Sequence, residues 1–101
     1  MSTKYERLVR LYAEEIAAIK KMQEGADKSL EDARSASAGI EDEYEIFVAE
    51  RQAYEAWNAA MYEVHLAKEK LHADIEAEYA NVPYSAPREQ GITKFYELAG
   101  I

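Results

Sequence analysis

The fold is decided by residues 40–79, which read IEDEYEIFVAERQAYEAWNAAMYEVHLAKEKLHADIEAEY. Apolar side chains recur in this stretch in two rows that are offset by three residues. The first row holds Ile40, Phe47, Tyr54, Met61 and Ile75, and the second holds Trp57, Val64 and Leu71. Two such rows in a seven-residue frame form the seam of a coiled coil or helical bundle. The residues between them are mostly Glu, Ala, Lys and Arg, which favour helix, so the stretch predicts a long helix with one apolar stripe.

A shorter helix is predicted before this one, from about residue 3 to residue 24. Its apolar residues follow three-and-four spacing, at Tyr5, Leu8, Val9, Tyr12, Ile16, Ile19 and Met22. Gly25 is typical of a helix C-terminus, and Asp27 or Ser29 can cap a second helix over residues 29–80. Ser and Gly make residues 35–39 ambiguous, and we favour continuity or a local kink there because alanine is a strong helix former.

The two prolines predict a break over residues 81–87, since Pro83 and Pro87 cannot sit in a helix interior. A short amphipathic helix is expected over residues 88–99, with Gly100 as its stop. The expected fold class is therefore all-α, with a single domain over residues 1–101. It consists of an antiparallel helical hairpin with one long coiled-coil-like helix and a short C-terminal helix.

Helix lengths indicate that this hairpin is completed by self-association. At 1.5 Å per residue the first helix spans roughly 33 Å and the second roughly 75 Å, so the first cannot cover the second. The C-terminal segment, if it folds back, can cover only part of the seam beyond residue 55, so a second copy in a homodimer is expected to cover it. The residues assigned to self-association are Tyr54, Trp57, Met61, Val64, Leu71 and Ile75.

Acidic side chains are concentrated on the predicted long helix. The chain carries a net charge of −8, and residues 29–80 hold thirteen acidic and four basic side chains. Direct binding to nucleic acid or to an anionic membrane needs clustered Lys and Arg and is disfavoured. A basic surface on another protein is the expected partner, although an acidic face can also serve only to keep a protein soluble. The expected contact residues are Glu41, Asp42, Glu43, Glu45, Tyr62, Tyr84, Phe95 and Tyr96.

A metal site is the alternative that the two histidines raise. His65, Glu69 and His72 share one helix face, and a Glu three residues before a His is the spacing used in di-iron helical bundles. No facing carboxylates align with them, so no metal or other cofactor is expected. The sequence has no Cys, no Gly-rich phosphate loop and no nucleophile-elbow pattern, so an enzyme is not expected either.

The absence of Cys, of a signal-peptide pattern and of a long apolar run favours a soluble cytoplasmic protein. The expected function is a non-catalytic protein–protein interaction module. It would be a small acidic adaptor, regulator or inhibitor that occupies the surface of a partner, such as a nucleic-acid-binding protein. The alternatives are a metal-binding helical bundle and a structural subunit of a larger assembly.

Overall fold

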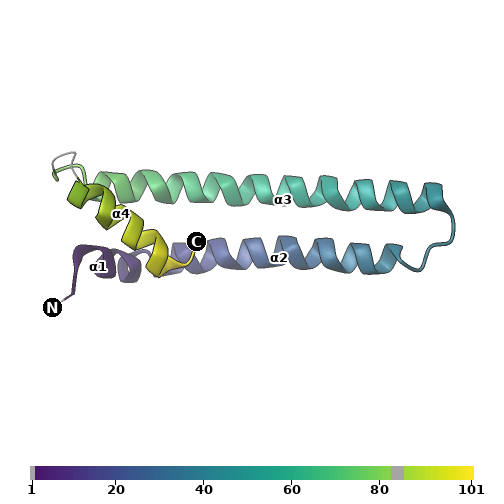
Figure 1. Cartoon of the computed structure of the whole chain (residues 1–101), viewed down its shortest axis with the longest axis horizontal. Coiled ribbons are helices and arrows are strands. Elements are labelled where there is room, and N and C mark those ends of the chain that lie inside the picture. The colour runs from purple at the N-terminus through teal and green to yellow at the C-terminus, as the bar shows by residue number, and fades with distance from the viewer. Residues whose placement is uncertain (1, 83–85) are drawn as a thin grey trace. The chain divides into compact units, whose positions relative to one another are not determined.

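The computed structural model of the chain describes residues 2–82 and 86–101. Within these residues it has four helices and no strand, which confirms the all-α class. The helices are α1 (Lys4–Leu11), α2 (Ala13–Ser37), α3 (Glu43–Glu78) and α4 (Ala86–Ala99) (Figure 1). The chain divides into two compact units. We call residues 1–20 with 67–101 the terminal unit, and residues 21–66 the hairpin unit.

The hairpin turns at residues 38–42, so two predictions are wrong: the turn at Gly25, and the continuous or kinked helix across residues 35–39. In the hairpin unit, α2 and α3 run antiparallel on either side of this turn (Figure 1). The Arg34 carbonyl accepts both the Ser37 hydroxyl, at 2.9 Å, and the Ala38 N–H, at 3.2 Å, so the serine side chain adds a second hydrogen bond at the end of α2. Asp42 then starts α3, because its carboxylate accepts the Tyr44 N–H at 2.8 Å and the Glu45 N–H at 3.3 Å.

Gly25 lies inside α2 and does not end it. A helix cap of the expected type needs a glycine with positive φ, and within the described residues only Gly100 has one, at 72°. A glycine inside a helix costs about 1 kcal/mol relative to alanine. That cost is small for a helix of 25 residues.

Small side chains line the inner face of the hairpin unit. Five alanines face one another across α2 and α3 and help to line a cavity of about 210 Å³; they are Ala26, Ala33, Ala53, Ala56 and Ala60. The buried side chains of this unit are only those of Ala26, Ser37 and Val64. Alanine buries little apolar area, so the hairpin unit has almost no hydrophobic core of its own.

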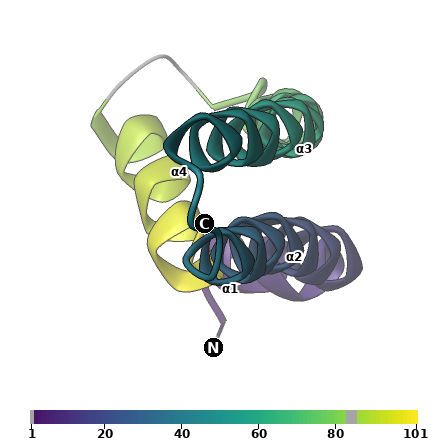
Figure 2. The ribbon, with the colours of Figure 1, turned by 90° about the vertical axis from the view of Figure 1, so that its right-hand side faces the viewer.

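The terminal unit has a normal core. Its buried apolar side chains come from all four helices and the turn after α3, and they are Leu8, Ile16, Ile19, Leu71, Ile75, Tyr79, Phe95 and Ala99. Helix α4 packs beside α1 (Figure 2). Thr3 caps α1 through the Glu6 N–H, and the first predicted helix is interrupted at Tyr12, which separates α1 from α2.

Polar contacts at the end of α3 connect this helix to the first residues of the chain. The Lys4 ammonium donates to the Glu78 carbonyl and lies 4.5 Å from the centre of the Tyr79 ring. The Tyr12 hydroxyl donates to the Glu78 carboxylate at 3.2 Å. Burial, and secondly this carboxylate, raise the pKa of Tyr12, so the hydroxyl remains a donor at neutral pH.

The last helix is longer than predicted, because it begins at Ala86 and includes Pro87 in its first turn. Proline is tolerated there because the first N–H groups of a helix have no partner within the helix. The predicted stop is confirmed, since the Gly100 N–H donates to the Tyr96 carbonyl at 2.9 Å. Residues 83–85 of the predicted break lie outside the described residues. Across residues 2–82 and 86–101, no helix is both long enough and apolar enough to span a membrane.

Candidate partner-binding groove

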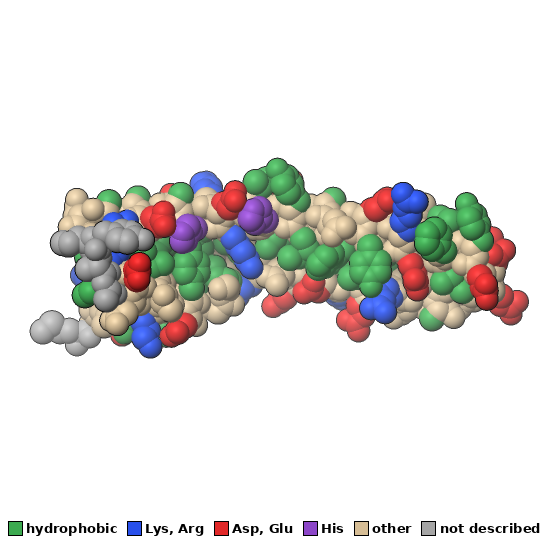
Figure 3. All heavy atoms as spheres, turned by 45° about the horizontal axis from the view of Figure 1, so that its top comes forward, with side chains coloured by type: hydrophobic (Ala, Val, Ile, Leu, Met, Phe, Trp, Pro, Cys, Tyr) green, Lys and Arg blue, Asp and Glu red, His purple; other side chains and the backbone are tan. Residues whose placement is uncertain are grey.

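The exposed part of the apolar seam lies in the hairpin unit. Phe47 is 60 % exposed and Tyr54 is 42 % exposed, while Trp57 and Met61 are half-buried. Figure 3 shows hydrophobic side chains at the surface along α3, with acidic side chains between them. Several large apolar side chains that remain exposed on one surface are typical of a binding site.

The seam beyond residue 64 is buried, contrary to the prediction that it would be left open. Val64, Leu71 and Ile75 are each at most 1 % exposed. Residues 67–78 of α3 belong to the terminal unit, whose buried side chains also come from α1, α2 and α4. The prediction failed because it placed the turn at Gly25, whereas α2 continues to Ser37. These three residues are therefore not available for self-association, and the exposed row lies nearer the turn.

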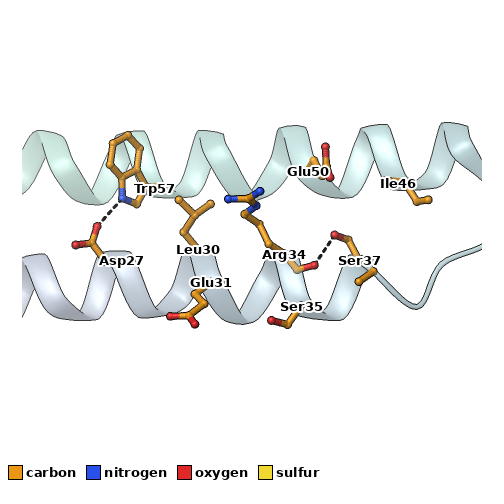
Figure 4. A pocket seen from close by; sticks show the side chains of 10 residues that line it. Asp27, Leu30, Glu31, Arg34, Ser35, Ser37, Ile46, Glu50 and Trp57 are labelled. Carbon is orange, nitrogen blue, oxygen red and sulfur yellow. Dashed lines mark hydrogen bonds between the residues drawn. The ribbon is translucent and has the colours of Figure 1, made fainter.

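A groove of about 680 Å³ runs between α2 and α3 in the hairpin unit (Figure 4). Leu30 and Arg34 point from α2 toward α3 (Figure 4). Both helices contribute apolar and charged side chains to its lining, which includes Asp27, Leu30, Glu31, Arg34, Ile46, Glu50 and Trp57.

The groove has an apolar floor with charged edges. Leu30, Ile46 and Trp57 are half-buried, so each offers part of its surface to a ligand. The Trp57 indole N–H donates to the Asp27 carboxylate at 3.0 Å, which fixes the ring across the two helices. This hydrogen bond joins α3 to α2 and orients an aromatic ring in the groove (Figure 4).

The acidic residues near the turn are all exposed, but they do not have equivalent roles. Asp42 caps α3, as described above, and so has a structural function. Glu43 and Glu45 lie in the first turn of α3, where negative charge also suits the helix dipole. Glu41 precedes the helix. All three glutamates present their charge to solvent.

The expected contact residues outside the turn are placed differently from one another. Tyr62 is 60 % exposed, as a contact residue should be. Phe95 is fully buried in the terminal unit, which removes it from any contact surface. Tyr96 is half-buried, and its hydroxyl lies 2.7 Å from His72 Nδ1. Tyr84 lies outside the described residues.

Among residues 2–82 and 86–101, no group of three or more His, Asp or Glu side chains is placed so that it could hold a metal ion. Both ring nitrogens of His72 have polar neighbours. Its Nδ1 faces the Tyr96 hydroxyl, and its Nε2 lies 3.0 Å from the Glu76 carboxylate. His72 thus helps to hold α4 against α3, and burial raises the pKa of its partner Tyr96.

Sequence reasoning missed the α2 side of the groove because it ended the first helix at Gly25. A signal was present: small or apolar residues keep three-and-four spacing across that glycine, at Met22, Ala26, Leu30, Ala33 and Ser37. Leu30 and Arg34 would then have fallen on a helix facing α3. Comparison of the chain with protein-family models, with curated proteins and with solved structures found no match.

Proposed function

We propose that this protein is a non-catalytic protein–protein interaction module, and that the hairpin unit binds a basic surface of its partner. The observation that carries the proposal is that this unit exposes Phe47 and Tyr54 while burying almost no large side chain of its own. A helical pair of this kind gains a hydrophobic core when a partner covers its apolar row. The protein would act as a small adaptor, regulator or inhibitor.

The distribution of charge supports a basic partner. The hairpin unit holds eleven acidic and four basic side chains, a net charge of −7, whereas the terminal unit has a net charge of −1. Complementary charge speeds association and excludes partners of like charge. Proteins that bind nucleic acid carry basic patches of the required sign, so they are one class of partner that fits.

Removing charge beside the turn tests this proposal. We expect Glu41→Gln, Glu43→Gln and Glu45→Gln together to weaken partner binding by about tenfold, since three exposed pairs at about 0.5 kcal/mol each amount to one decade. Asp42 is left unchanged because it caps α3. The partner is first captured from extracts of the native host, and its affinity for each purified variant is then measured.

The matched control removes the same charge from first-turn positions of the terminal unit, with Glu14→Gln, Glu15→Gln and Glu89→Gln. These changes should leave the affinity within about twofold, because all three glutamates lie outside the hairpin unit. Equal losses in the two triple variants would show that only total charge matters and would refute a hairpin site.

Self-association through the hairpin unit is the second candidate, and the exposed row of Phe47 and Tyr54 favours it. The dependence of binding on salt concentration distinguishes self-association from binding to a basic partner. Two hairpin units of net charge −7 repel each other, so added salt should strengthen a homodimer and weaken a complex with a basic partner. Light scattering on a sizing column at low and high salt measures directly whether salt strengthens a homodimer.

A further inference from the structure

We infer that the groove between α2 and α3 is the binding site of the hairpin unit, and that its occupant is a basic amphipathic helix of the partner protein. This inference rests on the proposed function and makes it specific. The described residues contain no strand edge for strand addition, and a groove between two helices suits the helix-in-groove mode of recognition. In that mode an amphipathic helix lays its apolar face into a hydrophobic groove.

The lining of the groove determines the chemistry of the occupant. Leu30, Ile46 and Trp57 are half-buried and would receive the apolar face of a third helix. Glu31 belongs to the α2 wall and Glu50 to the α3 wall, and both are exposed. Lys and Arg beside the apolar stripe of the occupant could reach both walls, because their long stems cover apolar surface while their charged ends stay in water.

A second copy of this chain fits the groove less well than a basic helix does. The charge that surrounds the groove is that of the hairpin unit, with a net value of −7, and a second hairpin unit would bring the same charge to the contact. Like charges placed together oppose association. The occupant is therefore a segment of opposite charge.

Arg34 is the one basic side chain among the described residues that line the groove, so neutralising it should have the opposite effect on binding from neutralising an acidic one. Its side chain points from α2 toward α3 (Figure 4), where it places a positive charge on the path of a basic ligand. Neutralising Arg34 should therefore strengthen the binding of a basic helix, whereas neutralising Glu50 should weaken it. A structural effect of the two substitutions would not reverse sign in this way.

The experiment uses a Trp-free peptide of Leu, Ala and Lys, about 18 residues and so about five helical turns long, with the leucines on one helical face. Trp57 is the only tryptophan of the chain, so its emission reports on the groove itself. We expect a saturable blue shift with this peptide. A peptide with Glu in place of Lys, and one with the same composition but scrambled order, should bind at least about tenfold more weakly.

Charge reversal in the groove is compared with charge reversal elsewhere on the hairpin unit. Glu31→Lys with Glu50→Lys should weaken binding of the peptide by about tenfold or more. The control, Asp32→Lys with Glu63→Lys, makes the same change of net charge at exposed positions that do not line the groove, and should change the affinity by less than about threefold. Arg34→Gln should strengthen binding and Glu50→Gln should weaken it. Far-UV circular dichroism verifies that each variant remains helical.

Three results would overturn the inference: no saturable change in Trp57 emission, equal binding of the acidic peptide, or equal losses in the two double reversals. If binding of the partner captured from the host depends on Glu41, Glu43 and Glu45, but the groove variants bind this partner with unchanged affinity, the groove is refuted and the proposed function stands. If neither the turn variants nor the groove variants change the affinity for the partner, both the groove and the proposed function are refuted.

Discussion

Phe95→Ala should lower the free energy of unfolding by about 3–5 kcal/mol, the largest single effect expected in this chain. The Phe95 ring is fully buried and meets the Tyr96 ring edge-on, with their centres 5.2 Å apart. It is the largest fully buried side chain and the main apolar anchor of α4. Its removal leaves a cavity, and the loss is large relative to the 5–15 kcal/mol that stabilises a typical domain. Urea unfolding followed by far-UV circular dichroism measures it.

The control is Leu98→Ala in the same helix. Leu98 is 53 % exposed, so its truncation should change stability by no more than about 0.5 kcal/mol. Both substitutions introduce alanine into α4, so helix propensity changes in the same favourable direction in each variant. If Phe95→Ala and Leu98→Ala lowered the free energy of unfolding by the same small amount, Phe95 would not anchor α4 as the structure indicates.

Gly91→Ala should destabilise the protein by about 1–3 kcal/mol, although glycine to alanine inside a helix ordinarily stabilises. A Cβ at position 91 would lie 2.9 Å from Tyr79 Cε1 and 2.9 Å from its hydroxyl oxygen. Tyr79 is only 4 % exposed, so displacing its ring would disturb the core of the terminal unit. Burial also raises the pKa of Tyr79, which fits a hydroxyl that has no hydrogen-bond partner among the described residues.

Gly25→Ala is the matched control and should stabilise by about 0.5–1 kcal/mol. Nothing lies within 4 Å of the Cβ that it would add to α2. The same variant distinguishes the continuous α2 from the turn that the sequence suggested, because alanine in a left-handed cap would destabilise. If Gly91→Ala raised the free energy of unfolding, the close packing of α4 against Tyr79 would be contradicted. If Gly25→Ala lowered it, the continuous helix α2 would be contradicted.

Periodicity predicted the elements of this fold better than it predicted where they turn. The heptad rows of residues 40–79 identified α3, and Gly100 marked the end of α4, although Pro87, which was assigned to the break, lies in the first turn of α4. Gly25 was misleading because a single glycine costs little inside a long helix. Ser37 and Asp42 carry the true signal, since the Ser37 hydroxyl donates to the last turn of α2 and the Asp42 carboxylate accepts the first N–H groups of α3. Such roles depend on local geometry that residue types alone do not determine.

Packing between segments distant in sequence explains the remaining differences. Placing the turn at Gly25 left the second half of α3 largely uncovered, whereas Leu71 and Ile75 are buried in the terminal unit, so the exposed part of the seam was assigned to the wrong end. The groove depends on Leu30 and Arg34 facing α3, and the bond from Trp57 to Asp27 joins residues thirty positions apart. The acidic character of the hairpin unit, in contrast, can be read directly from the sequence.

Hydrogen exchange, measured by mass spectrometry with and without the basic peptide, tests most directly whether the hairpin unit is the part completed by a partner. Alone, amides of residues 43–57 should exchange faster than those of residues 67–78 in the same helix, because the hairpin unit buries few large side chains. Adding the peptide should slow exchange over residues 26–57 and leave residues 4–11 and 86–99 unchanged. Equal protection along α3 without peptide, or protection gained only in residues 86–99, would contradict a hairpin unit completed by its partner.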